Sequence, residues 1–191
     1  MKSYEGFNNE APTQRAPMLP AGAYVAVIKA VKIDGAEPDQ RLVLRLEITE
    51  GEWAGYFTKR YQHDSGGRFE AKYKGDYYLQ IPNKANPRRQ HYDWDVNAFN
   101  AAIYNITASN PGFAWDWDET KLVGKTVGIN VRQGTYNGAP YTRIGRLEDA
   151  NAVRAGTVRA MPPMAARSSQ PAEPEQPAEP TFTPMDTDLP F

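Results

Sequence analysis

Cysteine is absent from the 191 residues of the chain, and histidine occurs only twice. The absence of cysteine excludes disulfides, a thiol nucleophile and zinc sites built on thiolates. The longest apolar run, residues 23–28, is much shorter than the roughly 20 residues that cross a bilayer, and residues 1–10 do not form a signal peptide. We therefore expect a cytoplasmic protein that needs no cofactor, no metal ion and no membrane.

Charge and proline are distributed unevenly along the chain. Residues 1–160 hold 21 Lys and Arg against 18 Asp and Glu, whereas residues 161–191 hold one Arg, five acids and 8 of the 16 prolines. Proline lacks a backbone donor and disfavours helix before it, so this tail is predicted to be a tether and not a core. The predicted organisation is an arm over 1–20, a folded domain over 21–160, a disordered linker over 161–184 and a tip over 185–191.

The domain has the alternating pattern of β-strands. Over residues 41–49 leucine and isoleucine alternate with polar residues such as Arg45 and Glu47, which predicts a strand with one wet face. Asn137-Gly138 is typical of a tight hairpin between the last two strands. The predicted strands are 23–33, 41–49, 55–62, 77–81, 126–133 and 141–147.

One helix is predicted between the fourth and fifth of these strands. Asp95 is the expected N-cap, Phe99, Ile103 and Ile106 follow at helical spacing, and Asn110-Pro111-Gly112 ends the helix. Because the strand at 77–81 is weak, the order resembles three strands, a helix and a closing hairpin. That is the order of the OB-fold, a mainly β, five-stranded Greek-key barrel with one helix between strands 3 and 4. An open sandwich fits almost as well.

The C-terminus carries the most specific motif, Asp186-Thr187-Asp188-Leu189-Pro190-Phe191. An aromatic end can enter an apolar pocket while its carboxylate accepts a charge-assisted hydrogen bond, and the acids steer the approach. The proline reduces the entropy that is lost on docking. We expect partner binding through Asp186, Asp188, Leu189, Pro190 and Phe191.

This tip resembles that of bacterial single-stranded DNA-binding proteins, in which acids precede Ile-Pro-Phe at the end of a disordered tail. It differs in having Thr187 among the acids and Leu189 in place of Ile. The body resembles the divergent phage-encoded members more loosely, on residues 19–24, 51–55, 122–125 and 152–156. The resemblance implies an OB-fold that coats single-stranded DNA and a tail that recruits replication, recombination and repair proteins, in a family whose members are commonly homo-oligomers.

The body also supports this interpretation without the resemblance. A site for single strands needs cations along the phosphates and aromatic rings under the bases. Residues 53–92 interleave nine aromatic residues with eight Lys and Arg, and residues 59–89 have a formal charge of +5. The final hairpin adds further cations and tyrosines. We expect DNA contacts from Arg45, Trp53, Tyr56, Lys59, Arg60, Tyr61, Lys72, Tyr73, Arg132, Tyr136, Tyr141 and Arg143.

Competing interpretations stay open at this point. Several of the aromatic residues can simply be core, and the cationic strand positions can be a solvated face. The cluster His91-Tyr92-Asp93-Trp94-Asp95 can bind a divalent ion, as a metal-dependent nuclease requires. Trp and Tyr platforms also bind sugars, as in a carbohydrate-binding β-domain. We expect no catalytic residue and no enzymatic activity.

Overall fold

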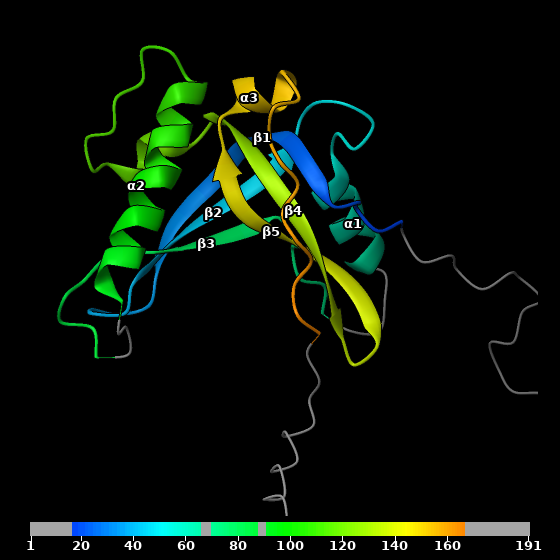
Figure 1. Cartoon of the computed structure of the whole chain (residues 1–191), viewed down its shortest axis with the longest axis horizontal. Helices are drawn as coiled ribbons and strands as arrows, with labels where there is room; N and C mark the ends of the chain where they lie inside the picture. The colour runs from blue at the N-terminus through cyan, green and yellow to red at the C-terminus, as the bar shows by residue number, and fades with distance from the viewer. Residues whose placement is uncertain (1–16, 66–69, 88–90, 167–191) are drawn as a thin grey trace, which may run out of the picture.

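The structure, a computed structural model, describes residues 17–65, 70–87 and 91–166. Its centre is a five-stranded antiparallel sheet in the order β3-β2-β1-β4-β5 (Figure 1). None of the described helices combines the length and apolar character that crossing a membrane requires. The elements are β1(Gly22–Asp34), β2(Arg41–Ile48), α1(Tyr56–Ser65), β3(Asp76–Gln80), α2(Tyr92–Ser109), η1(Glu119–Leu122), β4(Thr126–Tyr136), β5(Ala139–Glu148) and α3(Ala150–Arg154).

The long strand β1 belongs to both halves of the sheet. Its first part, Gly22–Val27, pairs with β4, and its residues from Ala26 onward pair with β2. The register against β2 shifts between Ile28 and Ala30. Such a bulge bends a strand and increases its twist, so the two halves of the sheet curve around one apolar interior.

The interior is lined by one side of every strand. Leu42, Leu44, Leu46 and Ile48 of β2 are buried there, as the alternation predicted. Helix α2 contributes Phe99, Ile103 and Ile106 to the same cluster. The strands β3 and β5 lie at the two edges of the sheet. Burial raises the pKa of the Tyr77 phenol on β3, and the positive charge of Arg143 on β5 opposes that rise.

Most of the predicted elements are confirmed. The strands predicted at 23–33, 41–49, 77–81, 126–133 and 141–147 correspond to β1, β2, β3, β4 and β5 within a few residues. The turn at Asn137-Gly138 is also confirmed, because both residues have positive φ, 48° and 76°, as a type I′ hairpin turn requires. The expectation of a mainly β domain with one substantial helix before the last hairpin is therefore correct.

The strand predicted at 55–62 is wrong, because these residues start helix α1. Tyr, Phe and Thr favour strands, which is the basis of the prediction. The helix forms because the Glu47 carboxylate on β2 accepts hydrogen bonds from the Phe57 and Thr58 backbone amides, at 3.0 and 2.8 Å. A negative charge at that position also complements the helix dipole. This partner is distant in sequence and therefore was not predicted.

Two side-chain predictions are also wrong. Asp95 is not the N-cap, because α2 begins at Tyr92 and Asp95 is buried within its first turn. Glu47 does not lie on a wet face, since only 5% of it is exposed. It is buried because it accepts hydrogen bonds at the start of α1.

The chain after β5 returns over the outer side of the sheet. Helix α3 packs on β1 and β4, with Val153 against Gly128. Residues 157–166, named here the covering segment, then cross β4 and β5, as the orange trace in Figure 1 shows. The Met164 amide donates to the Gln133 carbonyl at 2.7 Å, and Asn130 Nδ2 donates to the Arg159 carbonyl at 2.9 Å. The outer side of β4 is therefore covered by the chain itself.

Candidate nucleic-acid interface

A groove of about 580 Å³ separates α1 from the final hairpin. It opens between β5 and the loop before β3. Several residues predicted to contact DNA meet there from distant parts of the chain. The groove is lined by Met18, Leu19, Tyr56, Phe57, Arg60, Lys74, Val131, Ala139, Pro140, Tyr141, Thr142, Arg143 and Ile144.

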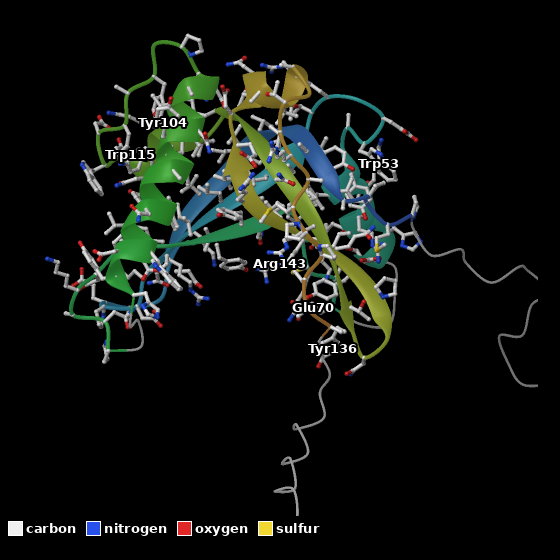
Figure 2. All side chains as sticks on the ribbon, viewed as in Figure 1. Trp53, Glu70, Tyr104, Trp115, Tyr136 and Arg143 are labelled. Atoms are coloured by element: carbon white, nitrogen blue, oxygen red, sulfur yellow. The ribbon has the colours of Figure 1, made fainter. Side chains whose placement is uncertain are left out.

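Three cations line the groove. Arg60 forms an ion pair with Asp64 one helical turn away, at 2.9 Å. Among the described residues, no ion-pair partner is present for Lys74 or Arg143, and both are exposed. Figure 2 shows Arg143 midway along the hairpin of β4 and β5. Two uncompensated charges in one groove attract an anion more strongly than paired charges do, because no internal carboxylate competes with it.

An aromatic platform lies on the outer side of α1 and β2. Tyr61 and Tyr73 have ring centroids 6.1 Å apart, and the Arg45 guanidinium lies 4.9 Å from the Tyr73 ring centroid. Asp76 holds Arg45 from the neighbouring strand through bonds of 2.9 and 3.1 Å, which leaves the other guanidinium donors free of that pair. Tyr61 is 42% exposed, so its ring is accessible to a planar ligand.

The structure anchors Tyr73 firmly. Its hydroxyl donates to the Leu46 carbonyl or the Glu47 carboxylate, both at 3.0 Å. Burial and the adjacent Glu47 carboxylate raise the pKa of the Tyr73 phenol, which stays neutral at physiological pH. The same carboxylate therefore positions both α1 and the aromatic ring beside it.

Arg41 and Tyr78 continue this surface along the sheet, and neither is among the residues predicted to contact DNA. The Arg41 guanidinium lies 5.7 Å from the Tyr78 ring centroid, and Tyr78 is 54% exposed. Arg41, Val43 and Arg45 share one side of β2 because they alternate along a strand. Tyr78 pairs with Val43 across the β2–β3 ladder, which places it on that same side. The alternation of β2 was the available signal for Arg41, but Tyr78 required the strand register.

Tyr56 and Trp53 hold the chain around the groove. The Leu19 amide donates to the Tyr56 hydroxyl at 3.0 Å, and that hydroxyl donates to the Pro17 carbonyl at 3.1 Å. The Trp53 ring packs edge-on against Tyr56, with centroids 5.5 Å apart. Both residues are half-buried. Tyr56 lines the groove and Trp53 packs behind it, and their ring faces are less available to a base than that of Tyr61.

The covering segment restricts two of the predicted site residues on the final hairpin. Arg132 is half-buried and donates from Nη2 to the Pro163 carbonyl at 3.4 Å. The Tyr141 hydroxyl contacts Met164 Sδ at 3.8 Å, although its ring also lines the groove. Tyr136 is 51% exposed at the tip of the hairpin, where Figure 2 labels it. The structure thus brings Tyr141 and Arg143 to the groove and directs Arg132 towards the covering segment.

The remaining predicted residues lie at the margins. Lys59 is exposed on α1, where its Nζ donates to the Ala54 carbonyl at 3.0 Å. Lys72 is exposed in the loop before β3. Asp186, Asp188, Leu189, Pro190 and Phe191 lie outside the described residues.

The cluster around His91 has a different arrangement from a metal site. The His91 ring stacks on Trp94, with centroids 4.2 Å apart, and Asp95 is buried in α2. Within residues 17–65, 70–87 and 91–166, no three His, Asp or Glu side chains gather into a group that could hold a metal ion. Comparison of the sequence with protein-family models and with curated proteins gives no match.

Proposed function

We propose that this chain is a single-stranded DNA-binding protein whose sheet is an open form of the OB barrel. Its β1 strand pairs with both β2 and β4, and α2 connects β3 to β4. This connectivity is compatible with the OB-fold, a five-stranded and partly open Greek-key barrel.

One observation carries the proposal: cations and aromatic rings alternate over the side of the molecule that the described chain leaves uncovered. Lys74 and Arg143 in the groove are followed by Tyr61, Tyr73 and Arg45 on the platform. Such a surface binds a single strand by neutralising phosphates while bases stack on rings, each stack contributing about 1–3 kcal/mol. OB-folds bind oligonucleotides on this side of strands 2 and 3 and between the first and last hairpin loops.

This mode of binding has little preference for sequence. Every base has a π-face, and phosphates are identical along the strand. The protein would therefore coat and protect exposed single strands wherever they form. Its affinity would decrease steeply with salt, because binding releases counterions from the strand.

The second part of the proposed function concerns the tail. Its final residues, Asp186 to Phe191, combine two carboxylates with an apolar pair and a terminal aromatic ring. We assign to them the recruitment of replication, recombination and repair proteins. The body then holds the strand, the tip holds the partner, and no catalytic step is required of either.

The experiment that tests this proposal is a titration of a dye-labelled oligo(dT) of about 20 nucleotides, a length that exceeds a single OB site. Fluorescence anisotropy is recorded at several salt concentrations, with duplex DNA of equal length as the control. We expect binding of the single strand at low salt, at least about tenfold tighter than the duplex because only unpaired bases can stack. Failure to bind the single strand at low ionic strength would overturn the proposal.

The same samples separate the alternative functions. Adding magnesium or manganese to the labelled strand tests for nuclease activity, and we expect the oligonucleotide to remain intact. Released fragments would favour the metal-dependent nuclease. Binding to a soluble polysaccharide in place of DNA would favour the carbohydrate-binding domain.

A further inference from the structure

A second aromatic and cationic surface lies beyond the end of β3, at the start of α2. The loop after β3 is fastened to the turn between β1 and β2 by three hydrogen bonds. The Ile81 amide donates to the Gln40 carbonyl at 3.0 Å, and Gln80 Nε2 donates to the same carbonyl at 2.9 Å. Asn86 Nδ2 donates to Asp39 Oδ1 at 2.9 Å. This loop therefore has a defined position at the Arg41 end of the uncovered surface.

A hollow of about 500 Å³ follows this loop, lined by Lys84, His91, Tyr92, Asp93 and Trp94. The Trp94 ring is stacked on His91 at 4.2 Å with an interplanar angle of 24°. Lys84 Nζ lies 5.3 Å from the centroid of the Tyr92 ring. The hollow thus repeats the composition of the groove and platform, with a cation beside rings.

The position of Trp94 is not explained by packing in the hydrophobic core. Helix α2 buries Asp95, Phe99, Ala102, Ile103 and Ile106, whereas Trp94 is 69% exposed. A large apolar ring gains little stability from so exposed a position. Its stack on His91 fixes the plane of the indole, so that a further planar group can bind without much loss of side-chain entropy.

We infer that the hollow is a second nucleotide subsite, in which a base stacks on Trp94 and its phosphate lies near Lys84. This inference rests on the proposed function, because the subsite extends the path of the same strand. The path would run from the groove over Arg45 and Tyr73 to Arg41 and Tyr78, and then past the loop to α2. Among the described residues, Asp93 is the one carboxylate that lines the hollow, so the phosphate would bind on the Lys84 side.

The test compares oligo(dT) of two lengths, about 6 nucleotides, near the lower end of the site size of one OB-fold, and about 20 nucleotides, above its upper end. The variants are Trp94→Ala, Trp94→Phe and Lys84→Gln. Tyr104→Ala is the matched control, since Tyr104 lies on the same helix and is 72% exposed. Thermal unfolding of each variant checks that the fold is retained.

We expect Trp94→Ala to weaken binding of the longer strand by about 5- to 100-fold, which is the loss of one stacked base. Its affinity for the shorter strand should stay within about twofold of the wild-type value, because the groove and platform accommodate that strand alone. Trp94→Phe should retain most of the affinity. Lys84→Gln should reduce the salt dependence of log K by about 0.7 for the longer strand only.

The outcomes distinguish failure of the inference from failure of the proposed function. If the wild-type protein binds neither strand, the proposed function itself is wrong, and the inference with it. If it binds both but Trp94→Ala behaves like Tyr104→Ala, the subsite does not exist although the protein binds DNA. An equal loss of affinity for the two oligonucleotide lengths would also overturn the inference. It would mean that Trp94 contacts the part of the strand that the groove and platform already bind.

Discussion

The outer side of the sheet differs between its two halves. At β4 it is covered by α3 and by residues 157–166, so that Gly128 and Asn130 are buried and Arg132 is half-buried. At β2 and β3, α1 packs only at the Glu47 end, and Arg45 and Tyr78 are exposed. Both halves belong to one sheet and both have arginines on their outer side. Arg45 is accessible to a ligand, whereas Arg132 is partly covered by the chain.

The comparison shows that cationic side chains have two roles in this domain: some hold the chain together and others are available to a ligand. Arg132 donates to a carbonyl of the covering segment, and Arg146 pairs with Glu148 on its own strand. Lys74 and Arg143 instead face a groove with no ion-pair partner among the described residues. A cation contributes to binding only where the chain has not already neutralised or covered it.

The largest effect on stability is expected from substitution of Glu47, which holds the start of α1 and Tyr73 in place. Glu47→Ala leaves the Phe57 and Thr58 amides without this acceptor, whereas the Tyr73 hydroxyl keeps the Leu46 carbonyl. Each unsatisfied buried donor costs about 1–3 kcal/mol, so the free energy of unfolding should fall by at least about 2 kcal/mol. Urea denaturation followed by circular dichroism measures this change.

Glu47→Gln is the control for this prediction, since its amide keeps one acceptor oxygen. It should lose less stability than Glu47→Ala. If both variants were as stable as the wild type, α1 would not depend on the carboxylate, and the support of the groove would have another origin.

The next effect concerns DNA affinity and compares the cations of the groove with those of the covered half. The double variant Lys74→Gln and Arg143→Gln removes two charges from the groove, whereas Arg146→Gln with Arg159→Gln removes two from the covered half. We expect the first to weaken binding of oligo(dT) by about 10- to 100-fold and to make the slope of log K against log salt shallower by about 1.4. The second should change the slope by less than half as much. Anisotropy titrations at several salt concentrations measure both.

Equal slopes for the two double variants would contradict the comparison. They would mean that affinity for the strand depends on the total charge of the domain and not on the charges of the groove. Circular dichroism of all variants shows whether a loss of affinity reflects a loss of fold.

Much of the fold follows from local patterns in the sequence. Alternation in β2 and β4, helical spacing of Phe99, Ile103 and Ile106, and the Asn137-Gly138 turn are each encoded by neighbouring residues. Helix α1 was missed because its stabilising partner, Glu47, lies on another element. The strand propensity of residues 55–62 predicts a strand, although tertiary hydrogen bonds make most of them helical.

The candidate site was predictable in composition but not in arrangement. The density of cations and tyrosines between residues 53 and 92 indicated a surface for a strand, and the structure brings Tyr61, Tyr73 and Arg45 together. No local pattern indicated that residues 157–166 cover β4 or that Tyr56 holds Leu19. Such contacts join residues that are far apart in sequence, so periodicity carries no information about them.

A third prediction tests whether the covering segment lies on the sheet in solution. Gly145 of β5 faces it, and a Cβ built there would lie 2.6 Å from Met161 Sδ. Gly145→Ala should therefore destabilise the domain by about 1–3 kcal/mol through overpacking. Adding Met161→Ala should recover part of that loss, with a coupling energy of at least about 0.5 kcal/mol.

Thermal or urea unfolding of the wild type, the two single variants and the double variant completes this cycle. Additive effects would mean that Met161 does not contact Gly145. The covered half would then be open in solution, and Arg132 would become available to DNA.

The smallest effect on stability is expected from an exposed ion pair that joins the two halves of the sheet. Glu50, which follows β2, pairs with Arg154 of α3, with Nη2 2.7 Å from Oε1. Hydrogen bonding to Arg154 lowers the pKa of Glu50 below its usual value. Because the folded pKa is lowered, the pair stabilises the fold at pH above the unfolded pKa of Glu and loses that contribution as the pH falls through the folded value.

Arg154→Ala should therefore reduce the free energy of unfolding by at most about 1 kcal/mol at pH 7, since both partners are exposed. The difference from the wild type should vanish at a pH below the lowered folded pKa of Glu50, where the carboxyl is protonated in both states. High salt at pH 7 should shrink it as well, because exposed charges are screened. Urea titrations at the two pH values measure the difference. A loss that persisted at low pH would mean that Arg154 acts through packing of α3 and not through its charge.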